Sequence, residues 1–260
     1  MRRVLTLVLL SSSFSGACTI SGREPAIVLA HVPDPFVDPL DAVLRVKSRD
    51  GECTGTVVAP RVVLTSRPCL VDIGAVSSDK VIDPGALRLR ARLGGGAVSY
   101  ASIPVSAVEE RECLGVAALI THTPLAVAPL RMRLHRSVAL GESVRVVGFG
   151  RCTSSAIGAR GVGFAGPVRA VTSTSLHVDA HACAGDVGGP VVSAGSQEVI
   201  GILLRDPIPI PPDHPSGKPI FDVPAGEAAR LDGEALPLIL RAVLSTYGVE
   251  PAALPGVACP

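Results

Sequence analysis

Residues 183–190 of this 260-residue chain read CAGDVGGP, and residues 53–69 read CTGTVVAPRVVLTSRPC. These two stretches decide the interpretation of the whole sequence. In the first, Asp186 is followed by Val187 among three glycines. Valine has no hydroxyl or thiol, so Val187 cannot attack a carbonyl carbon as a catalytic nucleophile does. In the second, Pro68 precedes the closing cysteine, and a proline side chain cannot accept a proton.

The two stretches resemble the nucleophile loop (C-x-G-D-S-G-G-P) and the histidine loop (C-x-G-T-L-I-A-P-x-x-V-L-T-A-A-H-C) of trypsin-like serine proteases, peptidase family S1. Three shorter segments resemble further strands of that family in the same chain order: residues 114–119, 144–150 and 199–204. The resemblance covers roughly residues 40–205. It implies an all-β fold of two packed antiparallel six-stranded Greek-key barrels with a C-terminal helix.

The resemblance also places the catalytic triad of the family on residues without the required functional groups. The His, Asp and Ser positions fall on Pro68, Gly115 and Val187. Gly185, Asp186 and Val187 would be the remnant of the oxyanion loop. The chain is therefore expected to be a catalytically degenerate bacterial homologue, a pseudoprotease with a protein- or peptide-binding role.

Two other functions stay open from the sequence. One is an enzyme of the same fold with a non-standard nucleophile or weak residual hydrolase activity, for which Cys183 beside His181 is the candidate pair. The other is a structural role in the cell envelope. By the resemblance, His181 lies at the floor of the specificity pocket. It is either a polar or pH-sensitive group that faces the pocket or an ordinary buried, hydrogen-bonded histidine. The six histidines show no H-E-x-x-H spacing, so we expect no metal and no cofactor.

Two segments depart from active members of the family. Their equivalent of Asp186 pairs with an amine released by proteolysis, and the nearest candidate here, residues 26–29, lacks the usual glycines and a preceding basic residue. A zymogen-like loop is expected.

Residues 207–212 hold four prolines where active enzymes pair with substrate. Proline has no N–H to donate, so this run indicates either a lost substrate strand or a polyproline surface loop.

The N-terminus has the pattern of an export signal. Arg2 and Arg3 precede the apolar run Val4–Leu10, and small residues lead to Cys18. We expect residues 1–17 to be a signal peptide. Ser15-Gly16-Ala17-Cys18 resembles a bacterial lipobox with lipid on Cys18; the alternative is ordinary cleavage and secretion. The chain is thus expected in the bacterial envelope, held to a membrane by lipid alone.

Seven cysteines leave one without a partner, which favours lipid on Cys18. By the resemblance, Cys53–Cys69 is the disulfide that brackets the histidine loop. The resemblance also favours Cys152–Cys183 and leaves Cys113–Cys259 as the third pair, in an oxidising compartment. The alternative for each cysteine is a buried free thiol.

Composition agrees with one β-rich domain. Hydrophobic residues make up 47% and aromatic residues 3%, without tryptophan, so the core must be aliphatic. The net charge of +1 does not favour nucleic acid as a partner. Residues 87–93 alternate leucine or alanine with arginine, which indicates a strand whose arginine face is either a binding patch or an ordinary solvated surface. Helical spacing appears in residues 233–247.

These patterns give the expected organisation. Residues 18–40 form a tether and residues 41–248 the protease-like domain, followed by a tail at 249–260. Within the domain we expect barrels at about 41–130 and 140–232 and a helix at 233–247. The expected strands are short runs bounded by turn residues: 42–46, 55–58, 62–66, 87–93, 116–120, 144–148, 168–171, 191–192 and 199–204.

Overall fold

The computed structural model describes residues 39–77, 79, 81–93, 99–110, 112–150, 161–163, 165–180, 182, 185–205 and 226–248. Residue contacts divide the chain between Val32 and Pro33. Everything before that division lies outside the described residues, including the expected signal peptide and the lipidation site Cys18.

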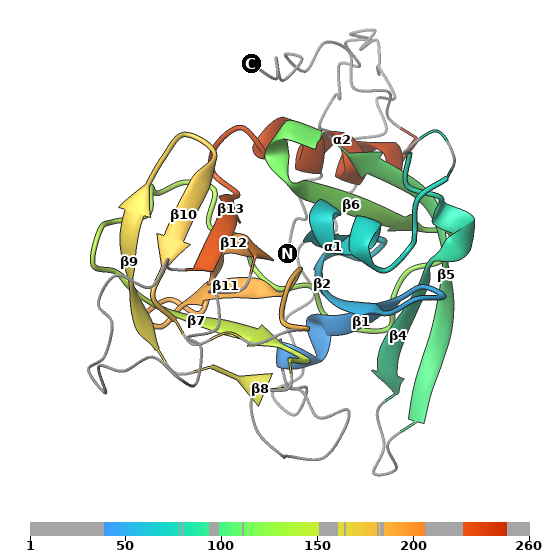
Figure 1. Cartoon of the computed structure of the whole chain (residues 1–260), viewed down its shortest axis with the longest axis horizontal. Coiled ribbons are helices and arrows are strands. Elements are labelled where there is room, and N and C mark those ends of the chain that lie inside the picture. The colour runs from blue at the N-terminus through green and yellow to red at the C-terminus, as the bar shows by residue number, and fades with distance from the viewer. Residues whose placement is uncertain are drawn as a thin grey trace, which may run out of the picture. The chain divides into compact units, whose positions relative to one another are not determined.

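The first barrel closes from six antiparallel strands (Figure 1). Around the barrel the order is β1-β2-β3-β6-β5-β4, and β4 pairs back onto β1. Short 3-10 turns lie at Pro39–Ala42, Pro84–Ala86 and Glu112–Leu114. The strands are β1 (Val43–Lys47), β2 (Glu52–Ala59), β3 (Val62–Ser66), β4 (Arg88–Leu93), β5 (Ser99–Glu110) and β6 (Val116–Thr121).

The second barrel has the order β11-β12-β13-β10-β9-β7 and closes through pairing of β11 with β7. A two-residue strand, β8, pairs with β7 outside this ring. Two six-stranded antiparallel barrels confirm the expected fold class. The strands are β7 (Ser143–Gly148), β8 (Gly161–Val162), β9 (Gly166–Val171), β10 (Ser175–Val178), β11 (Pro190–Ser193), β12 (Val199–Arg205) and β13 (Gly226–Arg230).

The interior is aliphatic, as the composition predicts. Fully buried leucines and isoleucines such as Leu44, Leu64 and Leu119 fill the first barrel, and Leu176 and Ile200 lie in the second. Burial of each such side chain contributes about 1.5–3 kcal/mol. The closed, close-packed barrels can therefore hold the connecting loops in defined positions.

Two α-helices pack on the first barrel. Helix α2 (Leu236–Ser245) lies inside the expected range 233–247 and contacts β5 and β6, burying Leu238, Ile239 and Ala242. Helix α1 (Arg67–Asp72) was not expected from periodicity. It begins because the Ser66 side chain caps the Cys69 N–H and Pro68 occupies the first turn, where its missing N–H costs nothing.

The segment between the barrels contacts both of them. The Leu130 N–H donates to the Val57 carbonyl of the first barrel at 2.9 Å. Met132 forms a parallel bridge with Val199 of the second barrel. The next residue, Arg133, is 1% exposed and begins a buried ionic cluster.

Arg133 makes a two-pronged ion pair with Glu142, at 2.9 and 2.6 Å. Its Nε atom donates to Glu198 at 3.4 Å, and the Ser193 hydroxyl donates to Glu142 at 2.6 Å. The Arg133 guanidinium, with the Ser193 hydroxyl and the Ala139 N–H, lowers the pKa of Glu142 to about 2, although burial opposes this shift. The cluster therefore fastens the connecting segment to the β11–β12 hairpin.

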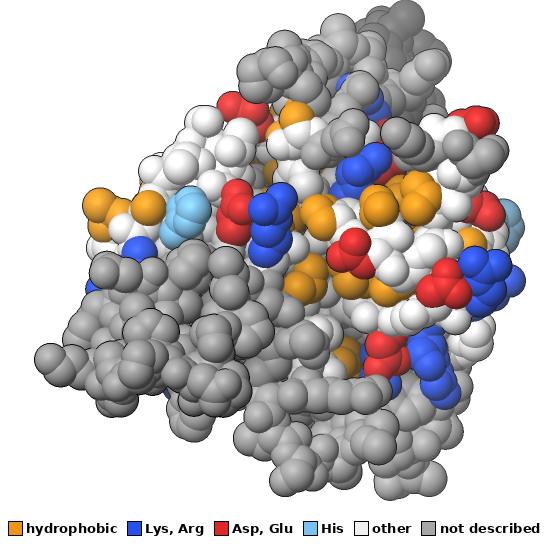
Figure 2. Space-filling model, viewed as in Figure 1, with side chains coloured by type: hydrophobic (Ala, Val, Ile, Leu, Met, Phe, Trp, Pro, Cys, Tyr) orange, Lys and Arg blue, Asp and Glu red, His pale blue; other side chains and the backbone are white. Residues whose placement is uncertain are grey.

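On the face drawn in Figure 2, acidic and basic side chains lie next to one another in small groups, and hydrophobic side chains lie between these groups. This mixed surface agrees with the net charge of +1. No helix among the described residues is long and apolar enough to cross a bilayer.

Candidate functional site

A cleft of about 170 Å³ lies where loops of the first barrel meet strand ends of the second. It brings together Pro68 and Gly115, two of the three positions that the sequence resemblance assigns to the triad. The lining residues are Pro68, Cys113, Leu114, Gly115, Thr174, Ser175, Leu204, Arg205 and Glu227.

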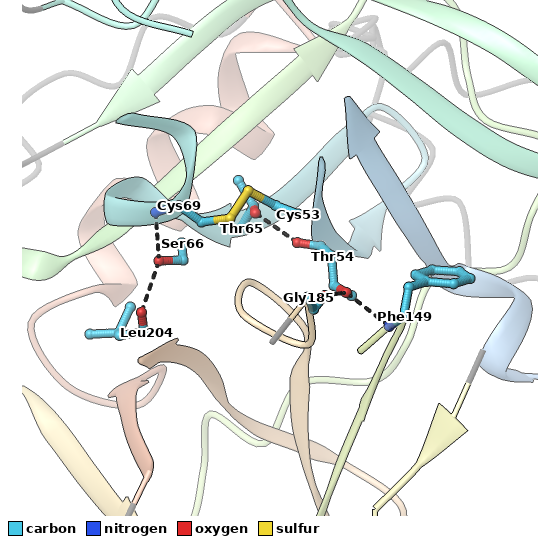
Figure 3. Close-up of a disulfide and its surroundings, with 8 residues drawn as sticks. All are labelled: Cys53, Thr54, Thr65, Ser66, Cys69, Phe149, Gly185 and Leu204. Carbon is cyan, nitrogen blue, oxygen red and sulfur yellow. Dashed lines mark hydrogen bonds between the residues drawn. A yellow bond between two sulfur atoms is a disulfide. The ribbon is translucent and has the colours of Figure 1, made fainter. Parts of the chain in front are cut away.

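Pro68 is held at the cleft by the start of α1. The Ser66 hydroxyl accepts from the Cys69 N–H at 3.4 Å and donates to the Leu204 carbonyl at 3.3 Å, so the turn is tied to β12 (Figure 3). Cys69 forms the expected disulfide with Cys53 of β2, with Cα atoms 6.2 Å apart. The disulfide and hydrogen bonds around Pro68, the expected histidine position, are therefore formed. The proline side chain itself cannot transfer a proton.

Gly115 has a backbone conformation and a neighbour that both oppose a side chain. Its φ is +64°, in the left-handed region, and its carbonyl accepts from the Arg67 N–H at 2.8 Å. A Cβ at this position would lie 2.8 Å from Leu204 Cδ1. An aspartate at position 115 would therefore require the Leu204 side chain to shift.

Val187 lies in a loop that Thr54 fastens to the first barrel. The Thr54 N–H donates to the Val187 carbonyl at 2.9 Å. The Thr54 hydroxyl donates to the Gly185 carbonyl at 2.6 Å and accepts from the Phe149 N–H at 3.2 Å (Figure 3). Thr65 in turn donates to the Thr54 carbonyl at 2.7 Å. Three segments distant in sequence thus meet at one fully buried threonine.

Glycine is required where this loop touches β2 and β3. Gly188 has φ of +89°, and a Cβ there would collide with the Thr54 carbonyl and the Thr65 hydroxyl. The Val187 side chain packs against the core of the second barrel, among its partly buried hydrophobic residues. The cleft lining includes Pro68 and Gly115 but not Val187, whose carbonyl is bonded to Thr54.

Asp186 is buried, and its Oδ1 atom accepts from the Gly150 N–H at 2.6 Å. A Cβ on Gly148 or Gly150 would collide with the Asp186 side chain, so these glycines make room for it. The candidate activating segment, residues 26–29, lies outside the described residues.

Several expected site residues also lie outside the described part of the chain: His181, Cys183, Cys152, Cys259 and the proline run 207–212. Cys113 is disulfide-bonded, and its partner is not among the described residues. The described residues hold no cluster of three or more metal-ligating side chains.

Three contributors to the site were not found from the sequence. Thr54 occupies a position that the family pattern leaves open. Arg67, beside Pro68, pairs with Glu110 at 2.7 Å, and Glu110 also accepts from the Ile82 N–H at 3.3 Å. Leu204 lies in the segment 199–204 that resembles a family strand, but the sequence did not reveal its approach to Gly115.

Comparison with known proteins agrees with this geometry. A Glu endopeptidase, solved in complex with MPD, matches with a TM-score of 0.59 and 13% identity over 81% of this chain and 94% of its own. Neuropsin, a serine protease expressed in the limbic system of mouse brain, matches with a TM-score of 0.57 and 16% identity over 78% of this chain and 94% of its own. At these identities the similarity shows the fold.

A curated mouse protein, consortin, is 40% identical over 58 residues, which make up 22% of this chain and 8% of consortin. The chain therefore matches less than a tenth of that relative's length.

The family model for Trypsin matches residues 34–206, about two thirds of the 260 residues. That span contains both cysteine-flanked stretches, Pro68 and Gly115 of the cleft lining, and the loop held by Thr54. The chain therefore belongs to the trypsin-like serine protease family.

Proposed function

We propose that this chain is a protease homologue without peptidase activity, which is exported, anchored by lipid at Cys18 and binds a protein or peptide. The contact of Leu204 with the Cβ position of Gly115 carries the catalytic part of this proposal. The lost aspartate is not merely replaced by glycine, because its space is filled by a leucine.

The remaining triad positions support the same proposal. The triad works as a unit in which Ser attacks, His takes its proton and Asp orients the His. Pro68 and Val187 can perform neither of the first two roles. A residual acceleration of about 10³–10⁴ over water, from binding and the oxyanion hole, would be far below that of a working protease.

Polar groups at the cleft support binding without catalysis. Arg205 and Glu227 are opposite each other on β12 and β13, and both line the cleft with Thr174 and Ser175. The Ser175 hydroxyl is paired with the Thr172 hydroxyl at 3.0 Å, and no histidine stands among the described lining residues. These groups can hold the amides or charges of a peptide, whereas the serine has no base to activate it.

Export and lipidation rest on the N-terminal sequence. Mass spectrometry of the membrane fraction should find the chain beginning at Cys18 with a diacyl or triacyl modification. A chain that begins at Cys18 without added lipid mass would contradict the anchor and leave the cleft proposal untouched.

The catalytic part is tested by incubating the purified mature chain with a fluorogenic peptide library and a fluorophosphonate probe. We expect no turnover and no covalent label. Turnover or labelling that Ser175→Ala or thiol alkylation abolishes would establish the enzyme alternative instead.

The binding part is tested by selecting displayed peptides on the immobilised chain and measuring the affinity of the selected peptides. Glu227→Lys should weaken them at least tenfold, because it reverses a charge in the cleft. Glu234→Lys makes the same charge change outside the cleft lining and is the matched control. Equal effects of both variants would contradict recognition by the cleft.

A further inference from the structure

A second cavity, of about 520 Å³, lies on the first barrel where the end of β1 meets β4. Four cationic side chains and two hydroxyl groups line it, and no carboxylate is among its described lining residues. We call it the basic groove and define it by Lys47, Ser48, Arg49, Arg88, Arg90 and Ser102.

The strand pairing of the barrel concentrates these cations. Leu87 and Leu89 are fully buried, so Arg88 and Arg90 face outward from the alternating strand. The β1–β4 register sets Lys47 directly opposite Arg88, and Arg45 opposite Arg90. Like charges directly opposite each other on adjacent strands are destabilising. A bound anion would relieve this repulsion.

Nearby carboxylates compensate only part of the charge. Glu52 contacts Arg45 at 3.0 Å and Lys47 at 3.5 Å, so one carboxylate serves two cations. Arg49 pairs with Asp50 at 2.9 Å. Arg88 donates to the backbone carbonyls of Gly85 and Leu87, and no carboxylate contacts it among the described residues. The charge of Arg88 is therefore available to a ligand.

A second observation concerns Ser48, whose side chain carries no charge. Its hydroxyl oxygen is buried and has no hydrogen-bond partner among the described residues. A buried hydroxyl left unpaired costs about 1–3 kcal/mol. The residue lines the groove and is itself partly exposed, so rotation about its Cα–Cβ bond presents the O–H to a ligand.

We propose that the basic groove binds an extended acidic segment of a partner protein. Alternate residues of an extended chain repeat at about 6.6 Å on one side, so glutamates at alternate positions give several registers in which a carboxylate meets Arg88. Guanidinium groups bind carboxylates through paired, charge-assisted hydrogen bonds. A nucleic acid would need a longer basic track, which a chain with net charge +1 and mixed surface charges does not favour.

Fluorescence anisotropy with a labelled decapeptide that has glutamate at every second position tests the proposal at physiological salt. The full mature chain should bind it and should not bind the same peptide with glutamine in place of glutamate. Arg88→Glu should weaken binding at least tenfold. Ser48→Ala, which leaves the net charge unchanged, should weaken it about threefold or more.

Arg136→Glu is the matched control, because Arg136 is exposed, lies outside the groove and gives the same change in charge. It should change the affinity less than twofold. Equal weakening by Arg136→Glu and Arg88→Glu, or no effect of Arg88→Glu and Ser48→Ala, would overturn the proposal. Displacement of the peptide by an oligonucleotide at lower concentration than by unlabelled peptide would also overturn it. The groove shares no lining residue with the cleft, so these results are independent of the peptidase assay.

Discussion

Leu204 Cδ1 lies 2.8 Å from the position that a Cβ would occupy at Gly115, and its Cδ2 lies 3.2 Å away. Leu204 is on β12 of the second barrel, and Gly115 immediately precedes β6 of the first. A side chain of one barrel therefore lies within contact distance of the Cβ position at which the family resemblance places an aspartate on the other. Under the proposed function, loss of catalysis in this chain involves a change of packing as well as of chemistry.

Gly115→Asp should lower the free energy of unfolding by about 1–3 kcal/mol, because it puts a side chain on a left-handed backbone and requires the Leu204 methyl groups to shift. Urea unfolding measures the loss. Adding Leu204→Ala should restore about 1 kcal/mol relative to additivity, since it opens the space.

Gly141→Asp is the matched control for that cycle. Gly141 has φ of +78°, and its Cβ position has no neighbour within 4 Å, so the substitution introduces backbone strain alone. If Gly141→Asp costs as much as Gly115→Asp, the collision with Leu204 is not the cause.

Thr54→Val should destabilise the protein by about 1–3 kcal/mol, because it leaves the Phe149 N–H and the Gly185 carbonyl without their buried partner. Thr56→Val, on the same strand, is the control. Thr56 is equally buried, but its hydroxyl donates to the Gly188 carbonyl over a longer distance of 3.5 Å. A smaller loss for Thr54→Val than for Thr56→Val in thermal unfolding would contradict the role of Thr54.

Protonation of Glu142 should lower the free energy of unfolding in acid. Its pKa is about 2 in the folded protein, below the ordinary value of 4.5, so its contribution is full above pH 4.5 and is lost as the pH falls toward 2. The loss amounts to about 3 kcal/mol at most. Urea unfolding between pH 6 and 2 measures it, and Glu142→Gln should flatten this part of the profile.

Asp50→Asn is the control for the acid profile. The Arg49 hydrogen bond also lowers the pKa of Asp50, but that pair is exposed to solvent and contributes little. The fall in stability at low pH should be reduced by Glu142→Gln and not by Asp50→Asn. The opposite result would show that the buried cluster does not control stability in acid.

Much of the fold followed from the sequence, because the cysteine-flanked stretches and the β-branched runs are local signals. The strand Val62–Ser66 was located to the residue. Strand β13, which reads GEAAR, was missed because glycine and alanine are depleted in strands. It forms a strand because β10 and β12 pair with it on either side.

The site was predictable as a set of positions and not as a set of contacts. Gly115 and Leu204 are 89 residues apart, so the sequence did not reveal that Leu204 lies at the Cβ position of Gly115. Thr54 likewise acts through bonds to Gly185 and Val187, more than 130 residues away. Such contacts depend on how the two barrels pack, which no local pattern encodes.

The central claim is that the cleft has lost its competence for hydrolysis together with its catalytic groups. The most direct test is peptide hydrolysis by the triple variant Pro68→His, Gly115→Asp and Val187→Ser, measured against the unmodified chain. The account predicts no rate above that of the unmodified chain, because Leu204 still obstructs the aspartate. Brisk cleavage by the triple variant would contradict it and would show that the cleft is still a working substrate groove.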